Sequence, residues 1–319
     1  MRRFGIVILL SLCAFFSSAQ SDPFFSHYMF NPLAYNPGWM GDATTASATF
    51  QHRSQWAGYS TTFDGDGGAP NSQLLSVIIP VQGVISSAGA LISLDQQGPE
   101  RTIRVQAGAA YNMNLQKGIL SFGLMPSLIS RTLDFSQFRF ETPGDPLDIG
   151  TVETQTKLDL SAGAFFRSYS GYFGGVAVDH ILSPSLIQVE GATQLSGQLN
   201  PTYYVHGGKV MSVNRDLDIT PSLLVKYNIS GVTADVSGIA TYRDLMWGGL
   251  SYRRSEAIIL LIGYNFLEDK TLKIGYSFDY VIQDQEAKRP TSHEIFLQYQ
   301  LPSLILGGRK AVKTPRFSF

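Results

Sequence analysis

The residues of this chain that could do acid–base or nucleophilic chemistry are scattered. Its five histidines are far apart and form no His-x-x-x-His pair; they are His27, His52, His180, His206 and His293. No Gly-x-Ser-x-Gly elbow is present. The nearest approach to a hydrolytic pair is His52 with Ser54, which a lipase would have to complete with a carboxylate from a separate strand. Such residues more often line a lumen or a rim, so the sequence favours a protein without enzymatic activity.

The sequence also predicts no cofactor. The loop Asp64-Gly-Asp66-Gly-Gly offers two carboxylates that suit calcium, but it lacks the third acidic ligand and the terminal Glu of a calcium loop. A solvated glycine turn is the better interpretation. The single cysteine, Cys13, lies in a segment expected to be removed, which excludes thiol catalysis, zinc–thiolate sites and iron–sulfur clusters from the mature chain.

The first residues are typical of an export signal. Arg2 and Arg3 precede an apolar stretch from Phe4 to Phe16, and small residues at 17–19 suit signal peptidase. The stretch is well short of the roughly 20 residues that a membrane-spanning helix needs. A lipoprotein start at Cys13 fits poorly because Leu12 stands where a small residue is required. We therefore expect a signal peptide at 1–19 and a mature chain beginning at Gln20.

The composition of the remainder favours a membrane-embedded β-barrel. Only 15% of residues are charged, mean hydropathy is near zero, and the chain contains 31 Gly, 15 Tyr and 20 Phe. A bundle of membrane helices would be far more apolar. A transmembrane barrel combines low charge with many glycines and aromatics because only alternate residues face lipid. The net charge of −1 predicts no nucleic-acid partner.

Alternation with a period of two residues dominates the chain after residue 42. Between 271 and 282, Leu272, Tyr276 and Tyr280 share one face while Ser277 and Asp279 share the other. Similar alternation predicts an all-β transmembrane antiparallel barrel of about fourteen strands, of which 202–213 is the least regular. The candidate strands are 43–53, 72–80, 86–94, 101–112, 118–130, 156–168, 171–181, 202–213, 217–227, 231–241, 246–254, 256–265, 271–281 and 291–300.

An even strand count returns both ends of the barrel to one side. The links 54–71, 131–155 and 182–201 are then long loops on the outer side, whereas 81–85, 113–117, 169–170 and 214–216 are short turns on the periplasmic side. We expect both mature termini in the periplasm. The alternative fold is a soluble β-sandwich or propeller, but its exposed face would be richer in Lys and Glu than the Ser, Gly, Thr and Gln seen here.

Two segments depart from the strand pattern and carry the candidate partner-binding residues. The leader, residues 20–42, holds Asn-Pro pairs that fix turns between aromatic side chains that need burial. We expect it to be ordered, either as a plug in the lumen or against the inner rim. The second segment follows the first candidate strand. The candidates are Tyr28, Phe30, Asn31, Pro32, Asn36 and Pro37 in the leader and Arg53, Gln55 and Trp56 in the second segment.

These segments resemble the PorP/SprF family of the type IX secretion system. The resemblance rests on Asp-Pro-x-Phe-Ser-x-Tyr-Met-Phe-Asn-Pro-Leu and Asn-Pro-x-x-x-Gly within 22–41, on Arg-x-Gln-Trp-x-Gly at 53–58 with Ala-Pro-x-Ser at 69–72, and on Ser-His-Glu-Ile at 292–295. The chain departs from the family at Gly38-Trp39-Met40, where Ala-x-Ala is usual, and in an insert from Ser60 to Gly67.

The resemblance implies a multi-pass protein of the cell outer membrane that belongs to the secretion and gliding machinery. It implies a secreted surface protein or adhesin with a type IX sorting domain and periplasmic components of the machinery as partners. The membrane barrel adds outer-membrane lipid as an expected partner. The expected domains are the signal peptide 1–19, the leader 20–42, the barrel 43–301 and a periplasmic tail 302–319.

The rival function is a general pore or small-molecule transporter, because a barrel of this size leaves a lumen that must be filled or plugged. The polar positions expected in that lumen mix both signs of charge and form no selective ladder. They are Arg104, Lys157, Asp159, Arg167, Lys226, Asp235 and Asp279.

Overall fold

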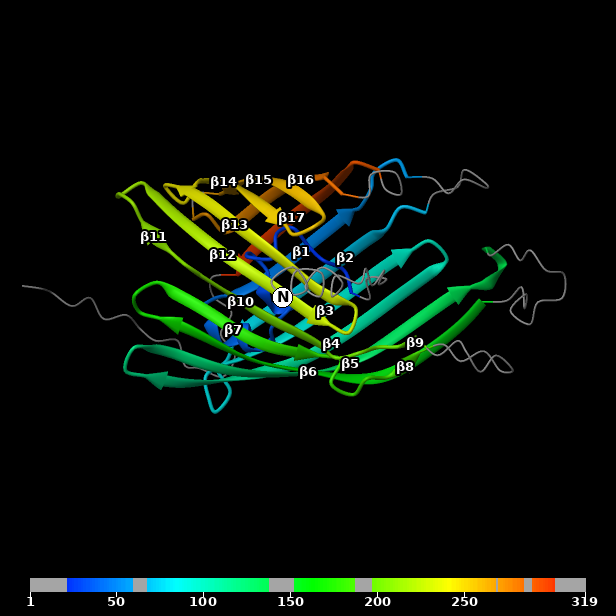
Figure 1. Cartoon of the computed structure of the whole chain (residues 1–319). Helices are drawn as coiled ribbons and strands as arrows, with labels where there is room; N and C mark the ends of the chain where they lie inside the picture. Colours follow the sequence, from blue (N-terminus) through cyan, green and yellow to red (C-terminus); the bar gives the residue numbers. More distant parts are fainter. Residues whose placement is uncertain are drawn as a thin grey trace, which may run out of the picture.

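The computed structural model describes residues 22–59, 68–137, 152–186, 197–267, 269–283 and 289–301. The predicted signal peptide, the C-terminal tail and the glycine loop with Asp64 and Asp66 lie outside these residues. Within them, strands form one antiparallel sheet that closes on itself (Figure 1). No helix in the described part of the chain is long and apolar enough to cross a membrane.

Closure joins the first strand to the last. Strand β1 pairs with β17 over the whole of Ala46–Ser54, and β10 pairs with both β7 and β12. Every neighbouring pair in the closed sheet is antiparallel. The strands are β1 (Ala46–Ser54), β2 (Asn71–Pro80), β3 (Ser87–Gln97), β4 (Glu100–Leu115), β5 (Gly118–Asp134), β6 (Val152–Ser168), β7 (Tyr172–Asp179), β10 (Thr202–Lys209), β11 (Met211–Ser212), β12 (Leu217–Asn228), β13 (Gly231–Tyr242), β14 (Met246–Arg253), β15 (Ala257–Phe266), β16 (Leu272–Val281) and β17 (Thr291–Leu301).

The predicted barrel of about fourteen strands is confirmed. Strands β10 and β11 both pair with β12 and are separated only by Val210, so they occupy one position in the barrel. This break accounts for the irregular pattern of 202–213. Two further short strands, β8 (Ser185–Leu186) and β9 (Gly197–Gln198), pair with each other in the link that follows β7. The predicted first strand begins late, at Ala46, because the leader's last helix ends at Asp42.

Alternate residues face lipid and lumen as the pattern requires. On β16, the side chains of Tyr276 and Tyr280 are exposed on the outer face, whereas Ser277 and Asp279 are fully buried on the inner face. The strands of such a sheet pair their backbone groups with one another within the wall, which is the condition for spanning a membrane.

The two ends of the barrel differ. We call the end where β1 stops and β17 starts the loop end, because it carries the links 55–70, 135–151, 180–201 and 282–290. The turn end, where β1 starts, carries the short links 81–86, 116–117, 169–171, 213–216, 243–245 and 267–271. The link between β3 and β4 at the loop end is only residues 98–99, so that rim is uneven.

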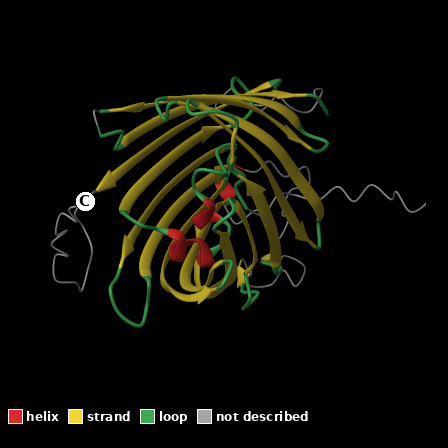
Figure 2. Cartoon of the chain, turned by 90° about the vertical axis from the view of Figure 1, so that its left-hand side faces the viewer, coloured by secondary structure: helices red, strands yellow, loops and turns green. Residues whose placement is uncertain are grey.

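The core of the molecule is the leader inside the barrel. Its two 3-10 helices, η1 (Pro32–Ala34) and η2 (Pro37–Asp42), lie within the ring of strands (Figure 2). Each begins with a proline whose missing N–H costs nothing at a helix start. Asn36 caps η2 by accepting a hydrogen bond from the backbone N–H of Gly38 over 2.8 Å. The turns predicted from the two Asn-Pro pairs are therefore short helices.

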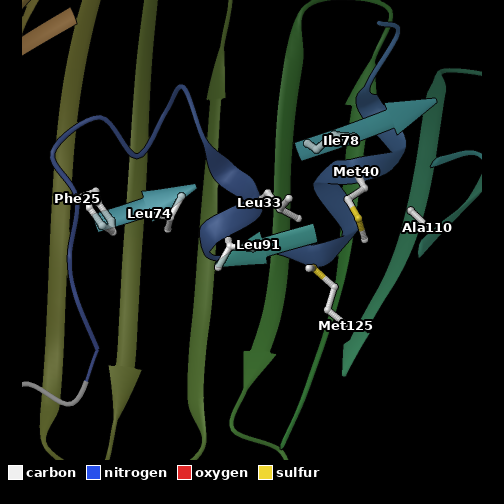
Figure 3. Close-up of a cluster of buried hydrophobic side chains, with 8 residues drawn as sticks. All are labelled: Phe25, Leu33, Met40, Leu74, Ile78, Leu91, Ala110 and Met125. Carbon is white, nitrogen blue, oxygen red and sulfur yellow. The ribbon is translucent and has the colours of Figure 1, made fainter. Parts of the chain in front are cut away.

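Apolar residues of the leader complete the interior. Phe25, Leu33 and Met40 pack against inward-facing wall residues, and all are buried (Figure 3). The wall residues of this cluster are Leu74, Ile78, Leu91, Ala110 and Met125. Because the leader contributes to three of the four buried clusters of the described residues, the lumen is packed like a domain core.

Candidate functional site

The first part of the leader is bound by charged residues from both strands of the closing seam. Glu294 of β17 accepts the backbone N–H groups of Ser26 and His27 over 2.6 and 3.1 Å, and it binds Nδ1 of His27 over 2.8 Å. The Ser26 hydroxyl donates to Asp279 of β16 over 2.7 Å. Arg53 of β1 donates to that same hydroxyl and to Asp279, each over 2.6 Å. Three strands therefore converge on one leader residue.

A second arginine extends this network along the wall, since Arg253 of β14 lies 4.0 Å from Asp279. Arg253 is fully buried and binds both carboxylate oxygens of Asp235 over 3.0–3.1 Å. Its guanidinium also lies 3.6 Å from Glu256 and 4.4 Å from the ring centroid of Phe24. Buried charges persist only when they are paired and hydrogen-bonded, and this group meets that condition by combining both signs.

The leader's first described residue is held by a third set of charges. Asp22 lies 2.8 Å from Nε2 of His180, which directly follows β7, and 3.4 Å from Nζ of Lys226. On its other side, Nδ1 of His180 binds Asp159 over 2.6 Å. The leader thus starts in the loop-end half of the lumen and runs toward the turn end, where β1 begins.

These contacts shift the pKa values of Asp22 and His180, which both lie outside the strands. Burial alone would raise the pKa of Asp22, but the charges of His180 and Lys226 hold it well below the usual 3.8. Burial alone would lower the pKa of His180, but the carboxylates of Asp22 and Asp179 and the hydrogen bonds to Asp159 and Asp22 raise it from 6.5 to about 10. The pair is therefore a charged ion pair at neutral pH.

The middle of the leader is held by amide and aromatic contacts. Asn31 donates to Gln51 over 2.8 Å and accepts from Ser76 over 3.1 Å. Phe30 packs against Trp247, with the two ring centroids 4.2 Å apart. The hydroxyl of Tyr28 lies 3.0 Å from that of Ser222. Four of the predicted residues, Tyr28, Phe30, Asn31 and Pro32, are thus bound to the wall or buried within the lumen.

The last part of the leader is held by close packing. The side chain of Asn36 donates to the carbonyl of Ala164 over 3.0 Å and lies 2.9 Å from Nε2 of His206. The backbone of Pro37 passes so close to Gly123 of β5 that a Cβ atom there would lie 2.2 Å from it. Only glycine permits this approach.

The second predicted segment lies at the loop-end rim. Arg53 points inward to Ser26, whereas Gln55 and Trp56 follow the end of β1 and are half-buried. The backbone N–H of Trp56 donates to the hydroxyl of Ser292 over 3.0 Å, and its backbone adopts a left-handed φ of 51°. The rim beside β17 is therefore fixed in an uncommon conformation.

The nine predicted residues do not form one exposed surface. Six leader residues and Arg53 are in the lumen, and Gln55 and Trp56 are at the rim. The sequence analysis placed Asp279 in the lumen and Glu294 in a motif but did not predict that they receive the leader, and it did not single out Arg253 or His180 as residues that do so. A signal existed for three of them, because Asp279, Glu294 and Arg253 alternate with apolar neighbours in strands and therefore face the lumen.

The groups that could bind a metal are paired with other protein groups. Ligand atoms of Asp159, Asp179 and His180 lie within 4.8 Å of one another, as a metal site would require. However, Arg104 donates a hydrogen bond to Asp179 over 2.6 Å, and Asp159 is hydrogen-bonded to Nδ1 of His180. The carboxylates are thus compensated by protein cations. Residues His52 and Ser54, on β1, alternate with the inward residues Gln51 and Arg53 and so face outward.

Most polar positions predicted for the lumen are inside it and paired. Arg104, Asp159, Lys226, Asp235 and Asp279 take part in the contacts above, and Arg167 binds Asp42 of the leader over 3.0 Å. Lys157 differs, because it is exposed on the part of β6 near the loop end. A cavity of about 50 Å³ lies between Asp22, Pro23 and the wall. This cavity has room for little more than one or two waters.

Fold and lumen define a β-barrel of the outer-membrane type that carries its own N-terminal segment inside. The chain belongs to the PorP/SprF family: residues 17–299 match the family model described as type IX secretion system membrane protein PorP/SprF. This confirms the resemblance read from the motifs and places the protein in the outer membrane. The sequence has no match among curated proteins.

Solved structures of similar fold are outer-membrane channels. The CymD monoaromatic hydrocarbon channel is 11% identical, with a TM-score of 0.51 over 89% of this chain and 95% of that chain. A Pseudomonas aeruginosa FadL homologue is 12% identical, with a TM-score of 0.48 over 83% and 92%. At such identity the similarity to CymD shows a shared fold.

Proposed function

We propose that this protein is a non-enzymatic component of the type IX secretion machinery that assists the secretion and surface anchoring of a specific exported protein. The observation that supports this is the convergence of three distant motifs at one place. The leader's Ser26 contacts Arg53, its His27 contacts Glu294, and Trp56 contacts Ser292. Motif residues from 22–41, 53–58 and 292–295 thus form one structural unit at the loop end.

The proposal assigns the loop end to the exterior and the turn end to the periplasm. Gln55 and Trp56 are then at the outer rim, where the sorting domain of an exported adhesin or other surface protein would bind. Periplasmic machinery components would contact the turn end. The leader would act from inside, because it fixes the strands from which the rim rises. No catalytic step is needed for this role.

The test is a chromosomal Trp56→Ala substitution in the native host, with deletion of the gene as the reference. We expect both to remove the same surface protein, while the variant barrel stays at its normal level in the outer membrane. The matched control is Ile229→Ala, since Ile229 is 78% exposed on another link of the loop end, outside the motifs. Unchanged secretion and display of every surface protein in the deletion strain would defeat the proposal.

A general pore is the competing function, and planar-bilayer recordings separate it from an anchor. The leader fills the described lumen and pairs its charges, so we expect no steady conductance from the purified protein. A large stable conductance with the leader in place would favour the pore.

A further inference from the structure

The outer face of the barrel has an apolar hollow that the secretion role does not use. It has a volume of about 790 Å³ and spans β4, β5, β6, β7 and β10. Small outward-facing residues, Ala109, Ala162 and Ala164, form its floor. Larger side chains, including Tyr111 and Tyr203, lie around them. The volume is in the range of pockets that bind one small ligand.

The hollow continues toward the turn end along two strands. Val176 of β7 and Val205 of β10 line it and are directly opposite each other in the sheet. The next outward pair is Gly174 opposite Gly207, which leaves the outer surface without side chains. An apolar chain lying in the hollow therefore has an open path along β7 and β10 to the end of the barrel.

A cation stands at the end of this path. The next outward pair is Tyr172 opposite Lys209, with the ammonium group 3.1 Å from the tyrosine hydroxyl and 4.4 Å from the ring centroid. Among the described residues, both side-chain contacts given for this ammonium group are with Tyr172 and neither is with a carboxylate. Strand geometry places Lys209 about 13 Å from Val205, since a strand rises about 3.3 Å per residue.

The neighbouring turn adds to this polar end. The backbone N–H of Tyr169 donates to the carbonyl of Lys117 over 3.1 Å, which joins the turn of β4 and β5 to that of β6 and β7. The side chains of Tyr169 and Tyr172 are 69% and 53% exposed. Aromatic and basic residues at the end of an apolar wall are typical of the level of lipid headgroups.

We propose that this surface is a binding site for one phospholipid. Its phosphate binds Lys209 and the hydroxyl of Tyr172, and an acyl chain passes over Gly174 and Gly207 into the hollow floored by the alanines. The charge supports this occupant, because an unpaired lysine at a membrane surface attracts anionic headgroups. A protein partner would find almost no polar side chain in the hollow to pair with. The proposal is independent of the exported partner.

Native mass spectrometry of the purified full chain, reconstituted in phosphatidylethanolamine nanodiscs that contain phosphatidylglycerol as the probe, tests this site. We expect one phosphatidylglycerol to survive extraction into detergent. Lys209→Gln should lower its retention about fivefold, which corresponds to about 1 kcal/mol for one basic residue near the surface. Ala164→Phe should abolish retention by filling the hollow.

Matched controls separate this site from general lipid adhesion. Lys157→Gln removes an exposed positive charge near the loop end, and Ala240→Phe enlarges an exposed outward alanine on β13. Both should retain lipid as the unchanged protein does. Equal loss in the controls, retention in Ala164→Phe, or a change of oligomeric state without lipid loss would overturn the proposal. Retained gel mobility of the folded barrel shows that each variant is assembled.

Discussion

The leader is held differently in the two halves of the lumen. In the loop-end half, Asp22, Ser26 and His27 are bound by buried carboxylates and cations from four strands and the link after β7. In the turn-end half, Pro37 and Met40 are held mainly by close approach to glycine and to apolar side chains, and an ion pair joins Asp42 to Arg167 where the leader ends. Charge contacts respond to pH and to the loss of a partner charge, whereas packing responds to volume. One segment thus has a switchable half and a fixed half.

Removal of a buried charge should have the largest effect. Arg253→Met leaves Asp235 and Glu256 without their cation, and breaking such a buried pair costs about 3–5 kcal/mol. Urea unfolding in detergent micelles measures the loss. The control is Arg243→Met, because the Arg243–Asp216 pair is about half exposed and exposed pairs contribute about 0–1 kcal/mol. Equal losses in the two variants would show that the lumen charges are not the stronger contacts.

A larger residue in the wall should disrupt the packing of the leader in the turn-end half. In Gly123→Ala the new methyl group would lie 2.2 Å from the backbone of Pro37, so the leader or β5 must shift, at a cost of about 1–3 kcal/mol. A spin label at Trp39→Cys should become more mobile. In the matched control Gly238→Ala, the methyl group meets nothing within 4 Å. An immobile label in Gly123→Ala would mean that the wall tolerates the larger residue.

A change of pH should affect the charged half alone, with the smallest effect. His180 holds its proton up to about pH 10 inside the barrel but only to about 6.5 when unfolded, so its contribution is complete below pH 6.5 and is lost as the pH rises toward 10. The lowered pKa of Asp22 makes its own contribution complete above about pH 3.8 and lost below it. A spin label at Pro23→Cys should therefore gain mobility as the pH rises through about 10, where His180 loses its proton inside the barrel.

A second label at Ala34→Cys, among apolar neighbours, should keep its mobility over the same range. In His180→Gln the pH response at residue 23 should disappear. A label at residue 34 that responds as strongly would mean that the halves open together.

The sequence predicted the barrel better than it predicted the site. Alternation identifies the inward faces of β16 and β17, so Asp279 and Glu294 could be placed in the lumen. Their contact with Ser26 could not be predicted, because Ser26 and Glu294 are 268 residues apart and meet only through closure and strand register. The close approach of Pro37 to Gly123 could not be predicted either, because a glycine in a strand pattern does not indicate which segment packs against it. The aromatic residues of the leader predicted that it is buried, but they did not decide between a plug in the lumen and a segment against the inner rim.

The position of Ser26 has a consequence for assembly. Its three charged or hydrogen-bonding neighbours are Arg53 on the first strand, Asp279 on the penultimate strand and Glu294 on the last. This set of partners exists only after the two ends of the sheet have met. Leader docking and closure of the barrel in the membrane are therefore coupled, and an incompletely closed chain has no finished receptor for its own N-terminal segment.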